Sequence, residues 1–426
     1  MKCPRIALVA LTAVAFVASG VLLAQAAPTQ AHSTVDRAAQ PTYVVVIDGG
    51  SGGTRAILFS DTPGSLASTL VWKSSPGTAG LSSFDSDPGK AGPDAVAPLI
   101  TQLDAKLTEL GIVASDVPIA LLATAGLRKL QETNPQAVEQ ILASTNATLT
   151  ASGHPVQANG ILPANQEASL AWVDTNVLNG SLGKRVGSLG IVEMGGASAQ
   201  VAFRSPRAAG PGVVQVRVNG QRIPVVAVSY LGLGANLARD AAQAENSGAS
   251  FCFPRNPTGA NPAAYDLGIA VPVASNVALY KFRACSQAYG RVVRTAGVAV
   301  KPAAPVALSN LRNLSGFSET RFIGLGGIAP ILANLDVASG TDERVTIPAA
   351  LRATCAGQNA WAKVMARFDK DSTYPQTMCP NASFIRQLLF GKNGVGVAGD
   401  RFEGRPALPG GQPSWPGGYA TTLLHP

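Results

Sequence analysis

The chain has 426 residues, which is enough for two domains with substantial cores. Its formal net charge is +8, which favours mild attraction of anionic substrates, but it has no basic run interleaved with aromatic residues, so nucleic-acid binding is not supported. Only 3 histidines are present. His32 and His425 lie near the ends of the chain and His154 lies in a Gly-Pro turn, which argues against a serine-hydrolase triad and a histidine-based zinc site.

The N-terminal segment has the composition of a targeting sequence. Residues 1–26 combine the basic start MKCPR, an apolar stretch over 6–23 and the small-x-small sequence AQA, which predicts a secretory signal peptide. An uncleaved N-terminal anchor is the alternative. Residues 27–41 are polar and predict a disordered leader. No later stretch reaches the ~18 apolar residues of a membrane span, so we expect an exported protein, periplasmic or secreted, without membrane contact after cleavage.

Two segments of the same design begin at residues 43 and 189: YVVVIDGGSGGTRAILF and LGIVEMGGASAQVAF. Each has an apolar run, a carboxylate, a Gly-Gly pair with small residues and a second apolar run, which predicts a strand, a tight turn and a returning strand. In such turns backbone N–H groups can close around an anion and hydroxyls can reach it. We expect the two turns to bind one phosphate chain from both sides, through Gly50, Ser51, Gly52, Gly53, Thr54, Gly195, Gly196, Ala197 and Ser198.

A carboxylate stands at the end of the first strand in each copy, Asp48 in one and Glu193 in the other. This is a usual place for a group that holds a metal ion or its waters. The alternative for a single residue of this kind is a turn-capping carboxylate. The matched placement of the two favours a shared role.

Between and after the copies, short apolar runs alternate with helix-like stretches such as 95–111, and a strand is predicted over 117–126. This rhythm is typical of an α/β fold. Thr124 lies at the end of that strand with Arg128 just beyond it. Glu167 lies at the start of an amphipathic helix predicted over 164–180.

Four cysteines remain after the predicted signal peptide, an even number that favours two disulfides in an oxidising compartment. Three pairings are possible. We favour the sequential one because each bond then closes a short loop within one region, joining Cys252 to Cys285 and Cys355 to Cys379.

Several motifs follow one another in a recognisable order. IDGGSGGT is followed by ATAGLR at 123–128, then by Glu167, Trp172 and Asn176, then by EMGGASAQ at 193–200 and FIGLGGIAP at 322–330. Together they resemble the conserved regions of the ecto-apyrases, the nucleoside triphosphate diphosphohydrolase family, over most of residues 43–424. This sequence departs from the family pattern where Gly52 replaces a serine, Glu193 an aspartate and Ala199 a threonine.

The resemblance implies roles for individual residues. Glu167 would be the general base, although a lone glutamate there could also serve the helix dipole. Arg128 would be either a phosphate contact or a structural ion-pair partner, and Trp172 belongs to the core. A divalent cation, Ca²⁺ or Mg²⁺, would be held through water by Asp48, Thr124, Glu193, Gln200 and Trp415. Phe384 and Arg386 are weak candidates for binding the base.

The fold implied is two ribonuclease-H-like α/β domains of the actin-like ATPase superfamily, with a nucleotide cleft between them. The first domain would span 41–164 and be completed by 404–426, and the second would span 165–403. The expected activity is metal-dependent hydrolysis of nucleoside tri- and diphosphates to the monophosphate. An exopolyphosphatase-like phosphohydrolase, a nonhydrolytic nucleotide-binding module and a kinase of the same fold are the alternatives.

Overall fold

The computed structural model describes residues 43–61, 63–75, 77–244, 250–254, 280–338, 340–368, 375–404 and 408–426. The predicted signal peptide over 1–26 and the predicted leader over 27–41 lie outside these residues.

The first sheet contains five strands in the order β3-β2-β1-β4-β5. Its centre is β1, which pairs antiparallel with β2 and parallel with β4. The Val and Ile side chains of β1 are buried on both faces of the sheet, as expected for a central β-branched run. The strands are β1 Tyr43–Gly50, β2 Gly53–Ser60, β3 Thr69–Lys73, β4 Ile119–Ala123 and β5 Val156–Ile161.

The second sheet repeats this arrangement with one additional edge strand, in the order β11-β10-β6-β7-β9-β8. Here β6 takes the place of β1, pairing antiparallel with β7 and parallel with β10. The duplication predicted from the sequence is therefore present in the topology of the sheets. The strands are β6 Leu189–Met194, β7 Ser198–Arg204, β8 Val213–Val218, β9 Gln221–Leu231, β10 Arg321–Gly326 and β11 Phe402–Glu403.

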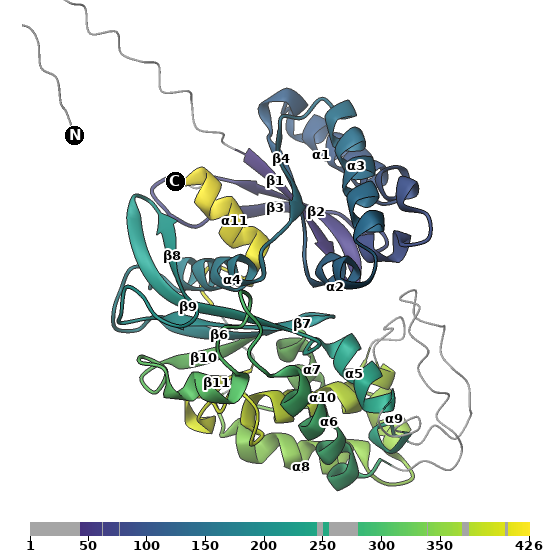
Figure 1. Cartoon of the computed structure of the whole chain (residues 1–426), viewed down its shortest axis with the longest axis vertical. Helices are drawn as coiled ribbons and strands as arrows, with labels where there is room; N and C mark the ends of the chain where they lie inside the picture. The colour runs from purple at the N-terminus through teal and green to yellow at the C-terminus, as the bar shows by residue number, and fades with distance from the viewer. Residues whose placement is uncertain are drawn as a thin grey trace, which may run out of the picture. The chain divides into compact units, whose positions relative to one another are not determined.

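Helices cover both faces of each sheet. One face of the first sheet packs on α1 Ala97–Leu110, α2 Ala125–Thr133 and α3 Pro135–Ala151. The other face shares an apolar cluster with α4 Ala164–Leu178, α11 Trp415–Leu424 and the near face of the second sheet (Figure 1). The helix α4 is consequently buried on nearly all sides, and the amphipathic pattern expected for it is wrong. A helix between two sheets has no solvent-facing stripe.

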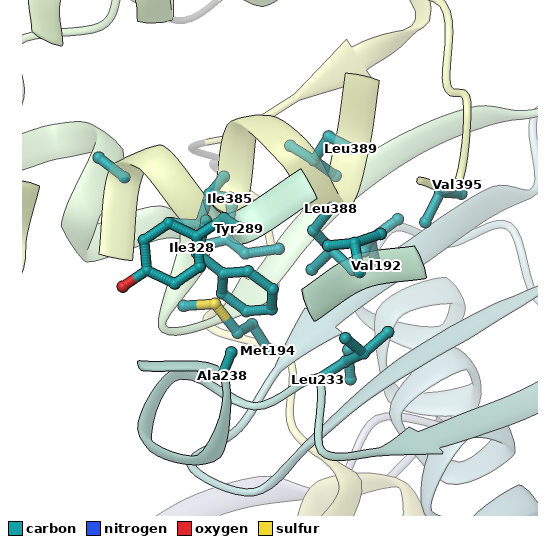
Figure 2. Packing of buried hydrophobic residues seen from close by; sticks show 14 of the residues in the cluster. Val192, Met194, Leu233, Ala238, Tyr289, Ile328, Ile385, Leu388, Leu389 and Val395 are labelled. Carbon is teal, nitrogen blue, oxygen red and sulfur yellow. The ribbon is translucent and has the colours of Figure 1, made fainter. Parts of the chain in front are cut away.

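The far face of the second sheet is covered by a third apolar cluster. Side chains of β6 and β7 such as Val192 and Met194 pack there against helix residues such as Tyr289 and Leu388 (Figure 2). The helices in this layer are α5 Ala235–Ala244, α6 Phe282–Ala296, α7 Ile328–Asn334, α8 Glu343–Cys355, α9 Ala360–Met365 and α10 Pro375–Phe390. Shorter turns lie at Leu81–Phe84, Pro88–Lys90, Ala91–Val96, Ala114–Asp116, Ser250–Cys252, Leu308–Asn313 and Gly399–Arg401.

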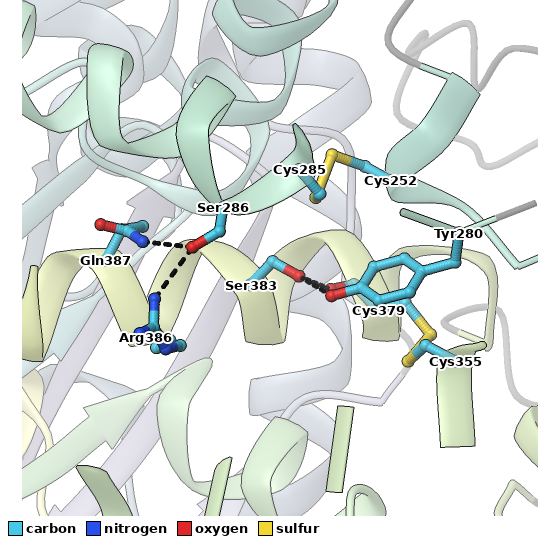
Figure 3. Close-up of a disulfide and its surroundings, with 9 residues drawn as sticks. All are labelled: Cys252, Tyr280, Cys285, Ser286, Cys355, Cys379, Ser383, Arg386 and Gln387. Carbon is cyan, nitrogen blue, oxygen red and sulfur yellow. Dashed lines mark hydrogen bonds between the residues drawn. A yellow bond between two sulfur atoms is a disulfide. The ribbon is translucent and has the colours of Figure 1, made fainter. Parts of the chain in front are cut away.

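Two disulfides brace this layer (Figure 3). One joins Cys252 to Cys285 on α6, and the other joins Cys355 on α8 to Cys379 on α10. These are the pairs that the sequence analysis favoured.

Residues Pro41–Pro426 form one compact unit by their contacts. The C-terminal helix α11 packs on α4 and on β1, so the end of the chain lies beside the first sheet. The division into domains at 41–164 with 404–426, and 165–403, is retained as a proposal. In the part of the chain that the structure describes, no helix combines the length and the apolar character needed to cross a membrane.

Candidate phosphate-binding and hydrolytic site

The two glycine-rich turns meet in the structure. The β1–β2 turn carries Ser51, and a Cβ built on Gly196 in the β6–β7 turn would lie 2.5 Å from the Ser51 Oγ atom. Any side chain at position 196 would therefore collide with the other turn. Ser51 of the first turn and Gly196 of the second thus lie in contact, whereas the binding of one phosphate chain by both turns stays a prediction.

The start of α5 holds the second turn in place. The N–H groups of Ala235 and Asn236 donate to the carbonyl oxygens of Gly195 and Gly196, at 2.9 and 2.8 Å. Gly234 packs so closely that a Cβ there would lie 2.2 Å from the Ala197 nitrogen. The Gly195 N–H group donates to the Ser198 carbonyl oxygen at 3.0 Å, so the N–H groups of Gly196 and Ala197 are the candidate donors to an anion in this turn.

Three carboxylates lie close enough to act on one another electrostatically. Asp48 lies near the end of β1, Glu193 lies near the end of β6, and Glu167 lies in the first turn of α4. Burial, with the neighbouring charge of Glu167, raises the pKa of Asp48 to about 7. Burial, with the charges of Glu167 and Asp48, raises the pKa of Glu193 to about 8. One buried and two partly buried acids that repel one another require a cation or protons to balance them.

Arg128 provides one such cation. Its Nη2 atom lies 2.6 Å from Glu167 Oε2, and its Nη1 atom donates to the carbonyl oxygen of Leu162 at 2.8 Å. Both side chains of the pair are mostly buried. Burial raises the pKa of Glu167, and the charge and hydrogen bond of Arg128 oppose that rise. Of the two roles considered for Arg128, this geometry corresponds to the ion-pair partner.

A chain of polar side chains runs along β7 and β9. Gln200 Nε2 donates to the hydroxyls of Ser198 at 2.6 Å and Ser229 at 3.1 Å, and all three residues are buried. The Gln200 Oε1 atom is buried and has no hydrogen-bond partner among the described residues. The Asp48 Oδ1 and Glu193 Oε2 atoms are likewise buried and have no hydrogen-bond partner among the described residues. Thr124 is buried where β4 ends and α2 begins.

Some predicted residues are placed elsewhere than expected. The Thr54 hydroxyl donates to the Ala79 carbonyl oxygen at 2.8 Å and is fully buried, so it is engaged in the hairpin and not available to a phosphate. Phe384 is 1% exposed and packs against Tyr289 in the core, which is inconsistent with stacking on a base. Its position on the inner face of α10 explains this burial. Trp415 is buried with Trp172 in the apolar cluster around α4.

Arg386 also lies in the helical layer and not beside the turns. It is on α10, and its Nη1 atom donates to the Ser286 hydroxyl on α6 at 2.9 Å. The sequence reasoning missed two residues of the site. Arg55 lies directly across the ladder from Asp48 and lowers its pKa against the effect of burial, and Ser229 continues the Gln200 network. Once the register of the β1–β2 hairpin is known, Arg55 is the β2 residue that lies opposite Asp48.

A sequence profile of the GDA1/CD39 (nucleoside phosphatase) family matches residues 35–258, which is more than half of the chain. The chain belongs to the GDA1/CD39 family. The motifs that define the two turns, together with Arg128 and Glu167, lie within the matched region.

Curated members of the family resemble parts of this chain. Ectonucleoside triphosphate diphosphohydrolase 2 of Mus musculus is 32% identical over 168 residues, which cover 36% of this chain and 33% of the relative. The Homo sapiens protein of the same name is 31% identical over 233 residues, 50% of this chain and 46% of the relative. Probable apyrase 4 of Arabidopsis thaliana is 35% identical over 171 residues, 38% and 33% of the two chains. The matches thus span about a third to a half of these relatives' lengths.

The fold has a solved counterpart. A structure of nucleoside triphosphate hydrolases from Neospora caninum aligns over 90% of this chain and 92% of that chain, with a TM-score of 0.56 and 16% sequence identity. At this identity the likeness establishes the fold alone. The α/β fold class predicted from the sequence is confirmed.

Proposed function

We propose that this member of the GDA1/CD39 family hydrolyses nucleoside tri- and diphosphates to the monophosphate and inorganic phosphate. The proposal is supported by the electrostatic coupling of Asp48, Glu167 and Glu193 and by the contact between the two glycine turns. Hydrolysis of a phosphoanhydride needs donors for the phosphate oxygens and a group that orients a water molecule in line with the leaving oxygen. The turns offer the donors, and Glu167 offers the orienting carboxylate.

Glu167 is the general base of this proposal. Its carboxylate would take a proton from the attacking water as the water oxygen bonds to the terminal phosphorus and the bond to the bridging oxygen breaks. A base is most effective when its pKa is near the working pH, and burial raises that of Glu167 from the usual glutamate range. Arg128 holds one carboxylate oxygen, which fixes the orientation of the other.

The residues present fit a divalent cation. The unpartnered buried oxygens of Asp48, Glu193 and Gln200 are hard donors of the kind that Ca²⁺ and Mg²⁺ prefer, directly or through water. Among the described residues no group of three His, Cys, Asp or Glu side chains is close enough to ligate an ion together, which favours ligation through water. Thr124 and Trp415 are retained as proposed members of this shell. A bound cation would neutralise negative charge on the phosphates.

We also propose that the protein is exported. Its two disulfides are typical of proteins that fold in an oxidising compartment. Nucleotides outside the cytoplasm would then be its substrates.

The test is phosphate release from ATP and ADP by the Glu167→Gln variant. Glutamine preserves size and hydrogen bonding to Arg128 but cannot accept a proton, so the rate should fall by about 10²–10⁴, with nucleotide binding largely kept. Glu132→Gln is the matched control, because Glu132 pairs with Lys129 on the exposed surface of α2. Near-full turnover in Glu167→Gln would refute the assignment of the base.

A further inference from the structure

A concentration of positive charge lies in the helical layer that covers the far face of the second sheet. An open groove of about 590 Å³ runs between α6 and the end of α10. We call it the basic groove. The described residues that line it include no acid, and its cations are Arg283, Arg291, Arg294 and Lys392.

Three further arginines adjoin one end of the basic groove. The guanidinium carbons of Arg352 and Arg386 lie 4.0 and 5.4 Å from the centre of one ring, that of Phe282, which also lines the groove. Arg344 on α8 is close enough to act on Arg386 electrostatically. We call Arg344, Arg352 and Arg386 the arginine cluster. Arg386 is 34 positions beyond Arg352, and Arg344 and Arg352 are more than one turn apart on α8. No basic run in the sequence therefore indicates the cluster.

In the described part of the chain Arg352 and Arg386 form no ion pair, whereas the Arg344 backbone N–H group donates to the Asp342 carboxylate at 3.0 Å. Burial and the like charges of Arg352 and Arg344 lower the pKa of Arg386, and Tyr280 opposes that shift in part. The Arg386 Nε atom is enclosed and has no hydrogen-bond partner in the described part of the chain. Apposed like charges with a buried, unpaired donor are costly unless an anion joins them.

The cluster is held rigidly in spite of its repulsion. Arg386 and Gln387 both donate to the Ser286 hydroxyl, so the Ser286 proton is left to donate to a further acceptor (Figure 3). The Cys355–Cys379 bond fixes α8 to α10, and Cys285 beside Ser286 is bonded to Cys252. The donors are thus positioned before any ligand arrives, which favours binding because little conformational entropy is lost.

We propose that the basic groove and the arginine cluster together bind an anion built of linked phosphates, either an inorganic oligophosphate or the phosphate tail of a nucleotide. A planar guanidinium group can donate two parallel hydrogen bonds to two oxygens of one phosphate. Several cations along a groove therefore suit a chain of linked phosphates better than they suit a single phosphate. The site is separate from the catalytic turns in the fold, so its existence does not depend on the proposed hydrolysis.

The test is equilibrium dialysis of the whole protein against two probes, tripolyphosphate and an ATP analogue with a methylene bridge between its β and γ phosphorus atoms. Arg352→Gln combined with Arg386→Gln should lose one bound equivalent of tripolyphosphate per chain, or weaken that site by about tenfold or more. The same loss for the ATP analogue identifies nucleotides as ligands as well, whereas loss for tripolyphosphate alone identifies an inorganic chain. If the double variant binds both probes as tightly as the parent protein does, the proposal is overturned.

A matched control separates specific binding from general attraction. Arg217 and Arg222 face each other across the exposed β8–β9 ladder, so Arg217→Gln with Arg222→Gln removes the same two charges from another arginine pair. Equal losses in the two double variants would overturn the proposal in favour of nonspecific screening. Because Arg386 is half-buried, Arg283→Gln with Arg294→Gln on the exposed side of α6 provides a second variant that should fold normally and also weaken tripolyphosphate binding.

Discussion

Replacing Arg128 with glutamine tests the ion pair at the centre of the site. The pair spans 2.6 Å between two mostly buried side chains. A charge-assisted hydrogen bond of this kind contributes about 1.5–3 kcal/mol, which corresponds to about 10- to 150-fold in a rate or equilibrium. In the variant Glu167 would still be buried but would lack the Arg128 cation, which lowers its pKa. The pKa of Glu167 should therefore rise further.

The direction of the pH effect follows from that rise. A general base must be deprotonated, so Arg128→Gln should lower kcat/KM for ATP most strongly toward low pH. The whole loss should be about 10- to 150-fold. Part of it should be regained as the pH increases, because Glu167 is then deprotonated. The measurement is the pH profile of kcat/KM for the variant and the parent protein.

Two variants serve as controls for this experiment. Arg128→Lys keeps a cation beside Glu167 and should shift the profile less, whereas Lys129→Gln removes a neighbouring exposed ion pair on α2 and should not shift it. A loss in Arg128→Gln that is the same at every pH would refute the reasoning. It would indicate that Arg128 contacts the substrate and does not act through Glu167.

Three further predictions concern other parts of the site and its scaffold. Chelation by EDTA should abolish phosphate release and added Mg²⁺ or Ca²⁺ should restore it, because the available donors are oxygens; full activity in chelator would contradict the cation proposal. Gly196→Ala should lower kcat by about 10²-fold by displacing Ser51, whereas Gly89→Ala, where a Cβ meets nothing within 4 Å, should not; equal activity of the two would refute the contact between the turns. Replacing Cys252 and Cys285 with alanine frees a link between residues 33 positions apart and should lower the free energy of unfolding by about 3–4 kcal/mol in urea titration. An unchanged midpoint and slope would contradict that expectation.

Some features of this protein were determined by the sequence alone because they depend on neighbouring residues. The two strand–turn–strand copies follow from β-branched runs around Gly-Gly pairs, which fix backbone conformation locally. A single fold containing both copies then places Asp48 and Glu193 at equivalent strand ends. The pairing of the cysteines within short loops was also predictable, since it required only their spacing.

Other features were decided by tertiary structure because they depend on which distant elements pack together. Arg128 and Glu167 are brought together only when α2 and α4 are both placed against the first sheet, and the pattern of neither helix contains that information. Burial of α4 on all sides follows from its position between two sheets, which periodicity in a single segment cannot reveal. The arginine cluster likewise forms from α8 and α10, which a disulfide joins. Local sequence sets the conformation of each element, whereas the partner of a buried charge is chosen by long-range packing.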